Sequence, residues 1–343
     1  MALQKLSSTD AFVVVDLDGA DAADGVVRWA KKVLVDGARN LARSRTYAHA
    51  LLGEQVSGAS AGISAVPEDR AAAVGAFVEE VTPRVTEGSL ILDPAKGVAA
   101  DDIATLLAAD GRPDWLSTTQ GSGTLADHLL AVGVATCAAA AAGSLDGRSV
   151  VLEGAGSAGP ALVEALAARG ARVVAVATSQ GCADTSAMEP GALVAAWSAA
   201  GEGLPAELSS EAPPAAALTT VADVLVCGSK VGLVDHEAAD RLAQQVVVPC
   251  GPLPVTARGL AVARRRDLTV LPDFLTTAGP LLAFRPADGV GADDVAGDVA
   301  RRLGGLAAEV MEHPEGPVLG ACYRAEDFLR TWREELPFGR PLA

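Results

Sequence analysis

The residues Gly154-Ala155-Gly156-Ser157-Ala158-Gly159 have the spacing of a turn that holds a phosphate group against the backbone. An apolar run over 149–153 precedes this turn, an alanine-rich helical pattern follows over 160–169, and a second apolar run covers 171–177. The order of strand, glycine turn, helix and strand is that of a βαβ unit with a dinucleotide fingerprint.

Each glycine of this turn has a separate expected role. Gly154 permits the tight turn, Gly156 lets the backbone approach a pyrophosphate, and Gly159 allows close packing of helix and strand. We expect Ser157 and Ala158, at the start of the helix, to present free N–H groups to the phosphates. The alternative is a glycine turn in an α/β fold that binds nothing.

The end of the second strand of this unit lacks the expected acid. A site for NAD normally has a carboxylate about 20 residues after the glycines, where it binds the ribose. Here that place holds Thr178-Ser179-Gln180. Because no carboxylate would repel a 2′-phosphate and the hydroxyls could donate to it, the sequence admits NAD or NADP as the cofactor.

The composition of the 343 residues limits the class of protein. Half of them are hydrophobic but only 3% are aromatic, so the cores must be built from Ala, Val and Leu. The net charge of −16 argues against a nucleic-acid partner, because no basic face offsets the repulsion of phosphates. The short basic run over 264–266 is interpreted as a solvated helix end.

The cysteine spacing and the hydropathy of the chain indicate in which cellular compartment the protein is expected. The five cysteines lie far apart and match neither metal nor disulfide spacing, so no metal site and a cytoplasmic location are expected. The first ten residues are polar and do not resemble a signal peptide. The alanine run over 131–143 is interpreted as too short and too weakly apolar to span a bilayer, so no membrane partner is expected.

The remaining pattern predicts an α/β protein with a small N-terminal α/β domain and a Rossmann-like, doubly wound parallel sheet. The expected domains are 1–126, 127–282 and a C-terminal helical segment, 283–343, which folds back between them. The expected helices are 33–52, 67–85, 101–109, 125–142, 235–244, 256–265 and 325–336, and the expected strands are 11–16, 89–92, 149–153, 171–177, 222–227, 245–249 and 268–272. Residues 201–217 are expected to form a loop.

Three stretches together resemble the glutamate/leucine/phenylalanine/valine dehydrogenase superfamily. Residues 46–51 (TYAHAL) and 57–63 (SGASAGI) are similar to the family's TYKxAL and GGxKGG-I segments. Residues 149–181 are similar to its cofactor-binding unit. Residues 248–256 and 271–279 (LPDFLTTAG) are similar to its GANGPTT and IPDFLANAGG segments. The resemblance covers most of the chain from about residue 25 onward and implies an amino acid dehydrogenase that uses NAD or NADP.

The catalytic positions implied by this resemblance hold unreactive residues. The lysine that binds the substrate carboxylate corresponds to Ala48, and the lysine that polarises the carbonyl corresponds to Ser60. The aspartate that exchanges a proton with the amine corresponds to Ala95. Since the loss of one such group commonly costs a factor of about 10² to 10⁴, the loss of three should abolish oxidative deamination.

Positions that the resemblance assigns to the cofactor have also changed. Two asparagines that seat the nicotinamide and the substrate correspond to Pro252 and Thr277, and a cofactor-contacting threonine corresponds to Leu130. Weaker contacts to the nicotinamide end are therefore expected.

Neighbouring residues offer weak replacements for the missing catalytic groups. His49 is a candidate acid or base, with a histidine bonded to a nearby backbone group as the alternative. Lys96 is a candidate cation for the substrate, or else a surface lysine in a loop. Ser60 could bind a neutral substrate, or be a small residue tolerated in a tight Gly/Ala loop. His128, near the predicted cleft, is expected to pack on the long helix.

These observations leave three functional hypotheses. The first is an NAD(P)-binding oxidoreductase whose usual deamination is lost or replaced by reduction of an uncharged imine or carbonyl. The second is a non-catalytic nucleotide-binding subunit that senses a nucleotide or pairs with an active paralogue. The third is an amino acid dehydrogenase with relocated lysines. A dinucleotide, an unknown small molecule and further copies of the chain are the expected partners.

Overall fold

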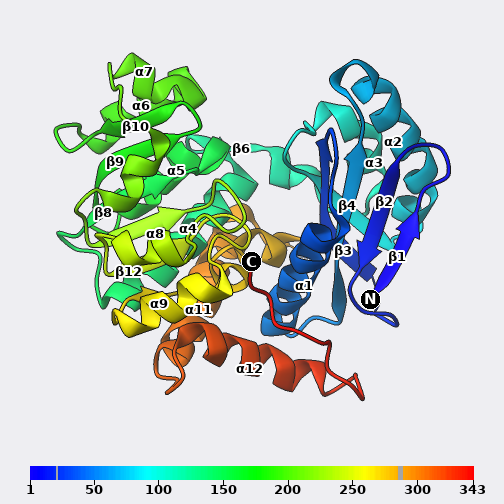
Figure 1. Cartoon of the computed structure of the whole chain (residues 1–343). Helices are drawn as coiled ribbons and strands as arrows, with labels where there is room; N and C mark the ends of the chain where they lie inside the picture. Colours follow the sequence, from blue (N-terminus) through cyan, green and yellow to red (C-terminus); the bar gives the residue numbers. More distant parts are fainter. Residues whose placement is uncertain (21, 285–288) are drawn as a thin grey trace. The chain divides into compact units, whose positions relative to one another are not determined.

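The computed structural model describes residues 1–20, 22–284 and 289–343, which form two compact units (Figure 1). The first unit comprises Met1–Arg112 and Cys322–Pro341, and the second comprises Pro113–Ala321 and Leu342–Ala343. Each unit has its own sheet and its own core.

The first unit contains a five-stranded sheet in the order β1-β2-β4-β3-β5. Its strands and helices are β1 (Ala2–Lys5), β2 (Ala11–Val15), β3 (Ala22–Ala30), α1 (Val35–Leu52), β4 (Val56–Ser64), α2 (Arg70–Thr86), β5 (Leu90–Pro94) and α3 (Ala104–Ala109). Strands β4, β3 and β5 are parallel, whereas β1 and β2 are antiparallel to their neighbours. This mixed sheet confirms the small α/β domain that the sequence predicts.

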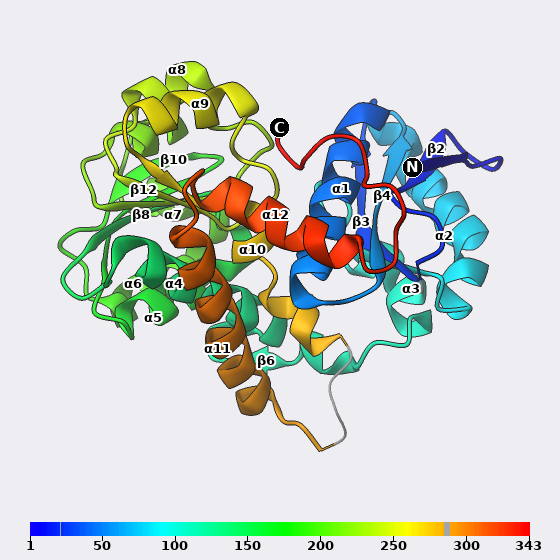
Figure 2. The same ribbon diagram turned by 90° about the horizontal axis from the view of Figure 1, so that it is seen from below.

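Helices cover both faces of this sheet (Figure 2). The larger core lies on the α2 face, where Phe77 and Val81 pack against small apolar residues of the strands. On the α1 face, Ala38 and Ala42 pack against Phe12 and Val14. The side chains of α1 here are small, so the helix lies close to the sheet, and a Cβ atom on Gly58 would lie 1.7 Å from the Ala42 carbonyl oxygen.

The second unit contains a six-stranded sheet in the order β10-β9-β8-β11-β12-β13. Its main elements are α4 (Leu125–Ala142), β8 (Ser149–Glu153), α5 (Gly159–Ala167), β9 (Arg172–Thr178), β10 (Gly181–Asp184), α6 (Pro190–Ala200), α7 (Leu204–Glu207), β11 (Val224–Cys227), α8 (His236–Arg241), β12 (Val246–Pro249), α9 (Ala257–Arg265), β13 (Thr269–Val270), α10 (Asp273–Thr276) and α11 (Ala292–Met311), with a short β6–β7 hairpin (Thr119–Gln120, Gly123–Thr124) at its start. Five strands are parallel, and only β10 runs antiparallel to its neighbour. The doubly wound parallel sheet is therefore confirmed.

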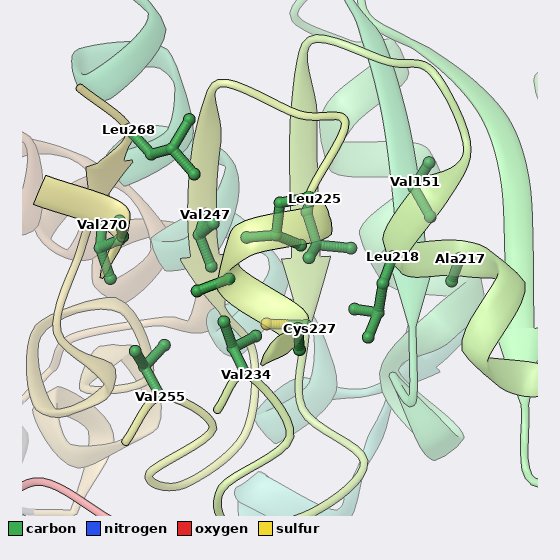
Figure 3. Close-up of a cluster of buried hydrophobic side chains, with 14 of the residues drawn as sticks. Val151, Ala217, Leu218, Leu225, Cys227, Val234, Val247, Val255, Leu268 and Val270 are labelled. Atoms are coloured by element: carbon green, nitrogen blue, oxygen red, sulfur yellow. The ribbon is translucent and has the colours of Figure 1, made fainter. Parts of the chain in front are cut away.

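The parallel strands are buried on both faces, which explains their continuous apolar sequences. Helices α8 and α9 lie on one face and α4 and α5 lie on the other (Figure 2). Small branched side chains such as Val151, Leu225 and Val247 fill the layer under α8 and α9 (Figure 3). This core is thus filled by small aliphatic side chains, as the low aromatic content predicts.

Helix α4 is long and apolar enough to cross a membrane by length and composition alone. The sequence-based interpretation that its alanine run is too short and too weakly apolar was wrong on that count, because the whole helix extends from Leu125 to Ala142. Half of this stretch is buried within the structure. Core helices of soluble proteins pass the same test.

The unit boundaries differ from the predicted domain limits. Residues 113–126 lie in the second unit, where Trp115 Nε1 donates to the Ala283 carbonyl at 3.2 Å and Leu125 N–H donates to the Thr118 carbonyl at 2.8 Å. The C-terminal segment is divided: α11 packs on α4 in the second unit. Helix α12 (Pro317–Leu329) begins in the second unit, and its residues from Cys322 onward are assigned to the first.

Several local predictions were wrong. Residues 57–63 form strand β4 and not a Gly/Ala loop, because their small side chains fit between α1 and the neighbouring strands. The helix expected over 325–336 ends at Leu329. Just after this end, the Thr331 hydroxyl donates a hydrogen bond to the Phe328 carbonyl at 2.7 Å. Residues 201–217 contain helical turns, and β1, β10 and α6 have no counterpart among the predicted elements.

Candidate functional site

The glycine turn joins β8 to α5 and has the conformation that its spacing predicts. Gly154 has φ +64°, and a Cβ atom there would lie 2.3 Å from Ser229. Gly156 has φ +56°, but a Cβ atom there would meet nothing within 4 Å. The backbone of Gly156 therefore faces open space, which is the space that a side chain would fill and that a pyrophosphate requires.

Gly159 is needed for packing against the neighbouring helix. A Cβ atom on Gly159 would lie 2.3 Å from the ring of Trp197, which α6 buries against the start of α5. The third glycine thus accommodates an indole ring from the neighbouring helix. Close packing of helix and strand at Gly159 stays a prediction.

The first turn of α5 lies beside an acidic group. Ser157 is exposed, and its hydroxyl donates to Asp127 Oδ1 at 3.1 Å. The other oxygen of Asp127 accepts hydrogen bonds from the backbone and hydroxyl of Thr124, which caps α4. Ala158 is buried. The two α-helix starts, α4 and α5, are therefore linked at this point by one carboxylate.

A cavity of about 590 Å³ opens in front of the turn. The β6–β7 hairpin, the start of α4, the glycine turn and the end of α6 supply its walls, which are lined by Thr119, Gly121, Ser122, Gly123, Thr124, Asp127, Gly156, Ser157, Pro160, Trp197, Ser198, Gly201 and Glu202. Among these lining residues, two are acidic and none is basic. A phosphate group in the cavity would rely on backbone N–H groups and hydroxyls.

The end of β9 carries a carboxylate that sequence reasoning missed. The strand itself ends at Thr178 and Ser179 follows it, but Glu202 reaches this end from a short helical turn after α6. Glu202 Oε2 accepts from the Ser179 backbone N–H at 2.9 Å and from its hydroxyl at 2.8 Å. The Thr178 hydroxyl donates to the Glu202 carbonyl at 2.6 Å. The hydroxyls expected to receive a 2′-phosphate are therefore already bonded to Glu202.

The other cofactor positions lie on the same unit. Leu130 and His128 are partly buried on α4, and Pro252 is exposed in the loop after β12. The Thr277 hydroxyl donates to the Asp273 carbonyl at 2.8 Å. Next to Pro252, Leu253 has φ +49°, a left-handed conformation that is rare for this residue type, and its N–H donates to the buried Asp273 carboxylate at 3.0 Å.

The first unit contains the three positions that the resemblance assigns to catalysis. Ala48 is buried on α1. Ser60 pairs with Val14 and Val26, which places it on the α1 face of the sheet. Ala95 directly follows β5. Ser60 is fully buried, and its hydroxyl has no hydrogen-bond partner within the described part of the chain.

A network of charged side chains occupies the same region. Arg45, one helical turn before Ala48, forms ion pairs with Asp24 of β3 and with Asp93 of β5. Arg112 Nη1 donates to Asp93 Oδ1 at 2.6 Å. The signal for this network in the sequence is the placement of charged residues within otherwise apolar strands.

His49 belongs to this network and does not bond to a backbone group as the sequence-based alternative held. Its Nε2 lies 2.8 Å from Asp24 Oδ2, and its Nδ1 lies 2.6 Å from Glu54 Oε2. Burial alone lowers the pKa of His49, but the hydrogen bonds to Asp24 and Glu54 outweigh it and raise the pKa above 6.5. Burial likewise opposes ionisation of Asp24, yet Arg45 and His49 lower the pKa of Asp24 to about 2.

The lysines and Arg28 are further basic groups outside the ion pairs described above. Lys96 is exposed in a turn after β5, and the other four lysines are exposed as well (Lys5, Lys31, Lys32 and Lys230). Arg28, which sequence reasoning missed, has Nε and Nη2 buried without a hydrogen-bond partner among the described residues. No group of three or more potential metal ligands lies close together within residues 1–20, 22–284 and 289–343.

The parallel sheet, the glycine turn and the cavity define a class of nucleotide-binding α/β proteins. Residues 121–283 match the family model described as glutamate/leucine/phenylalanine/valine dehydrogenase. The resemblance inferred from the sequence is confirmed by this match.

Two curated relatives match over 141 residues each. The chain is 33% identical there to NADP-specific glutamate dehydrogenase A1 of Halobacterium salinarum, over 39% of this chain and 33% of the relative. It is 26% identical to a glutamate dehydrogenase of Aeropyrum pernix, over 41% of this chain and 34% of the relative. The matched segment thus spans about a third of each relative's length.

The fold of the chain is similar to that of solved amino acid dehydrogenases. The hetero-hexameric glutamate dehydrogenase of Thermus thermophilus superposes with a TM-score of 0.77 at 22% identity, over 95% of this chain and 86% of that one. At this identity the likeness shows the fold alone.

Proposed function

We propose that this chain is an NAD(P)-binding oxidoreductase-family protein, related to amino acid dehydrogenases, in which ordinary oxidative deamination is lost or replaced. The replacement would be reduction of an uncharged imine or carbonyl. One contrast supports the proposal most: the backbone of Gly156 faces an open cavity, while the positions of the catalytic lysines and aspartate hold Ala48, Ser60 and Ala95.

The residues of the second unit fit a dinucleotide. The backbone of Gly156 and Ser157 would hold the pyrophosphate, since both are exposed and line the cavity. Bound NAD or NADP would supply hydride transfer. Leu130 and Pro252 offer the nicotinamide fewer hydrogen bonds than the family positions do, so we expect weaker binding than in an ordinary dehydrogenase.

The residues of the first unit do not fit amino acid deamination. That reaction needs a cation for the substrate carboxylate and a group that exchanges protons with the amine. Arg45 is held by the carboxylates of Asp24 and Asp93, and His49 lies between the same Asp24 and Glu54. The hydrogen bonds to these carboxylates raise the pKa of His49 and favour its protonated form, which opposes a role as a general base.

A second candidate function is a non-catalytic nucleotide-binding subunit that associates with an active paralogue. The similar Thermus thermophilus enzyme is hetero-hexameric, so different chains assemble in that protein. The third hypothesis, a dehydrogenase with relocated lysines, has less support because all five lysines are exposed.

Nucleotide binding can be tested by calorimetry with NADH and NADPH. We expect binding by the wild-type protein and at least a tenfold loss in Gly156→Val, because the new side chain would occupy the space that faces the cavity. Gly143→Val is the matched control, since Gly143 has φ +72° and open space around it but lies at the end of α4. Equal binding by all three proteins would contradict the proposal, and so would no binding by the wild type.

Turnover separates the two leading candidates. With Glu, Leu, Phe, Val or Ala and either cofactor, we expect no rate above background. A rate of about 1 s⁻¹, within the usual enzyme range, would contradict the loss of deamination. Reduction of an imine or carbonyl panel would favour the enzyme, whereas binding without any turnover would favour the regulatory subunit.

We also propose a homo-oligomer in a reducing cytoplasm. The apolar strand β2, expected at the sheet edge, is covered by β1, and the four residues of β1 are exposed. An exposed edge strand is a ready surface for pairing with another copy. All five cysteines are buried and none forms a disulfide within the described residues, as suits a reducing compartment. Light scattering that reports a monomer at micromolar concentration would contradict the assembly.

A further inference from the structure

Glu202 is placed where a nucleotide-binding fold normally holds its ribose-binding acid. In such folds that acid ends the second strand of the βαβ unit, which here is β9. Glu202 comes instead from a turn 24 residues beyond Thr178. The fold therefore restores, from a different segment, a group that the strand sequence lacks.

Two sets of hydrogen bonds fix Glu202 at this position. Its carbonyl accepts from the Thr178 hydroxyl at 2.6 Å, and its carboxylate accepts from the N–H and the hydroxyl of Ser179. Gly201, directly before it, has φ +54° and ψ −130°, a conformation available essentially to glycine alone. The main chain at this turn thus directs the side chain toward the end of β9.

The carboxylate of Glu202 also remains available to a ligand. Glu202 is exposed, and it lines the same cavity as Gly156 and Ser157. Only one of its two carboxylate oxygens, Oε2, makes hydrogen bonds within the described residues. The other oxygen can accept a hydrogen bond from a hydroxyl group placed at the end of β9.

We propose that Glu202 is the specificity-determining residue for the ribose of the bound nucleotide, and that it selects NAD over NADP. This inference rests on the proposed nucleotide binding. The ribose of NAD carries hydroxyl donors at this point, which a carboxylate accepts well. The 2′-phosphate of NADP carries a charge of about −1.5 to −2 and would be repelled. No basic residue among those lining the cavity offsets that repulsion.

The experiment compares NADH and NADPH binding by calorimetry for the wild type, Glu202→Gln and Glu207→Gln. Glu207 is the matched control, since it is exposed on the nearby α7 and does not line the cavity. We expect the wild type to bind NADH at least tenfold more tightly than NADPH. Glu202→Gln should reduce this ratio about tenfold, and Glu207→Gln should leave it unchanged. Thermal unfolding of each variant checks that the fold is intact.

A charge reversal, Glu202→Lys, gives a second and independent readout. It should bind NADPH more tightly than NADH, and that preference should weaken as the salt concentration rises. Tighter binding of NADPH by the wild type, or a ratio that Glu202→Gln leaves unchanged, would overturn the role of Glu202 while leaving nucleotide binding intact. Failure of the wild type to bind either nucleotide would overturn both proposals.

Discussion

Charged side chains are used differently in the two units. In the first, Asp24 and His49 are buried and Arg45 is half-buried, and Asp24 bonds to both basic groups. In the second, Asp127 and Glu202 bond to the protein through hydroxyl and backbone groups and line an open cavity. One set of charges is directed into the structure, and the other lies at a surface that a ligand can reach.

This difference teaches that the two units hold their charged groups by different means. A nucleotide site depends mainly on backbone shape, which three glycines preserve. An amino acid site depends on particular ionisable side chains, and the positions that the resemblance assigns to them hold Ala48, Ser60 and Ala95. Ion pairs satisfy Asp24 and Arg45 on this face of the sheet, whereas the Ser60 hydroxyl there has no hydrogen-bond partner among the described residues. Substitutions that disturb each region should therefore have different consequences.

The largest effect is expected from Asp24→Ala in the first unit. The change removes a buried carboxylate and leaves Arg45 and His49 each without one partner. Breaking a buried ion pair from one side costs about 3–5 kcal/mol of unfolding free energy. Urea denaturation of the purified protein measures this loss.

The control for Asp24→Ala is Asp36→Ala on α1. Asp36 pairs with Arg39, but 91% of its side chain is exposed. The expected loss is no more than about 1 kcal/mol. Similar losses of unfolding free energy for both substitutions would show that the buried network contributes no more than a surface pair. The contrast between the charged groups of the two units would then be contradicted.

An intermediate effect is expected from Gly159→Ala in the second unit. The new methyl group would lie 2.3 Å from the Trp197 ring, so α5 and α6 must move apart. Overpacking of this kind costs about 1–3 kcal/mol. Thermal and urea unfolding should both register the loss. Nucleotide binding is expected to weaken less than in Gly156→Val, because Gly159 is buried away from the cavity.

Gly191→Ala on α6 is the matched control for that substitution. A Cβ atom on Gly191 would meet nothing within 4 Å, and the residue lies near the start of the helix. Alanine is preferred over glycine in helices by up to about 1 kcal/mol, so stability should hold or rise. Destabilisation of Gly191→Ala to the same extent would mean that contact with Trp197 is not the cause.

The sequence predicted the second unit well because its signals are local. Apolar runs alternate with helical patterns from 149 onward, and glycine spacing identifies the turn between β8 and α5. The residues that the sequence missed depend on contacts between distant segments. Glu202 meets Ser179 across 23 positions, and Asp24 meets His49 across 25. No periodicity reveals such pairs.

Strand β4 shows a second reason for failure. The stretch 57–63 consists of Ser, Gly, Ala and Ile, and small residues of this kind are typical of loops as well as strands. It forms a central strand because α1 approaches so closely that Gly58 cannot bear a side chain. Tertiary packing overrides local propensity at this point.

The smallest effect is expected from the pH dependence contributed by His49. Its two hydrogen bonds to carboxylates raise its pKa above the ordinary 6.5, against the effect of burial. A group whose pKa is higher in the folded state stabilises that state fully below its unfolded pKa, and the contribution is lost as pH rises through the folded pKa. Stability should therefore fall above pH 6.5, by at most about 1.4 kcal/mol per pH unit.

His49→Gln tests this because glutamine can keep one hydrogen bond but does not titrate. The variant should be less stable than the wild type at pH 6, and the difference should shrink toward pH 9. The control His236→Gln changes an exposed histidine on α8 and should leave the pH profile unchanged. If the stability difference for His49→Gln is the same from pH 6 to pH 9, His49 is not held protonated. His49 would then be free to act as the relocated base. The contrast between charged groups that bond to one another in the first unit and carboxylates that line a cavity in the second would lose its main support.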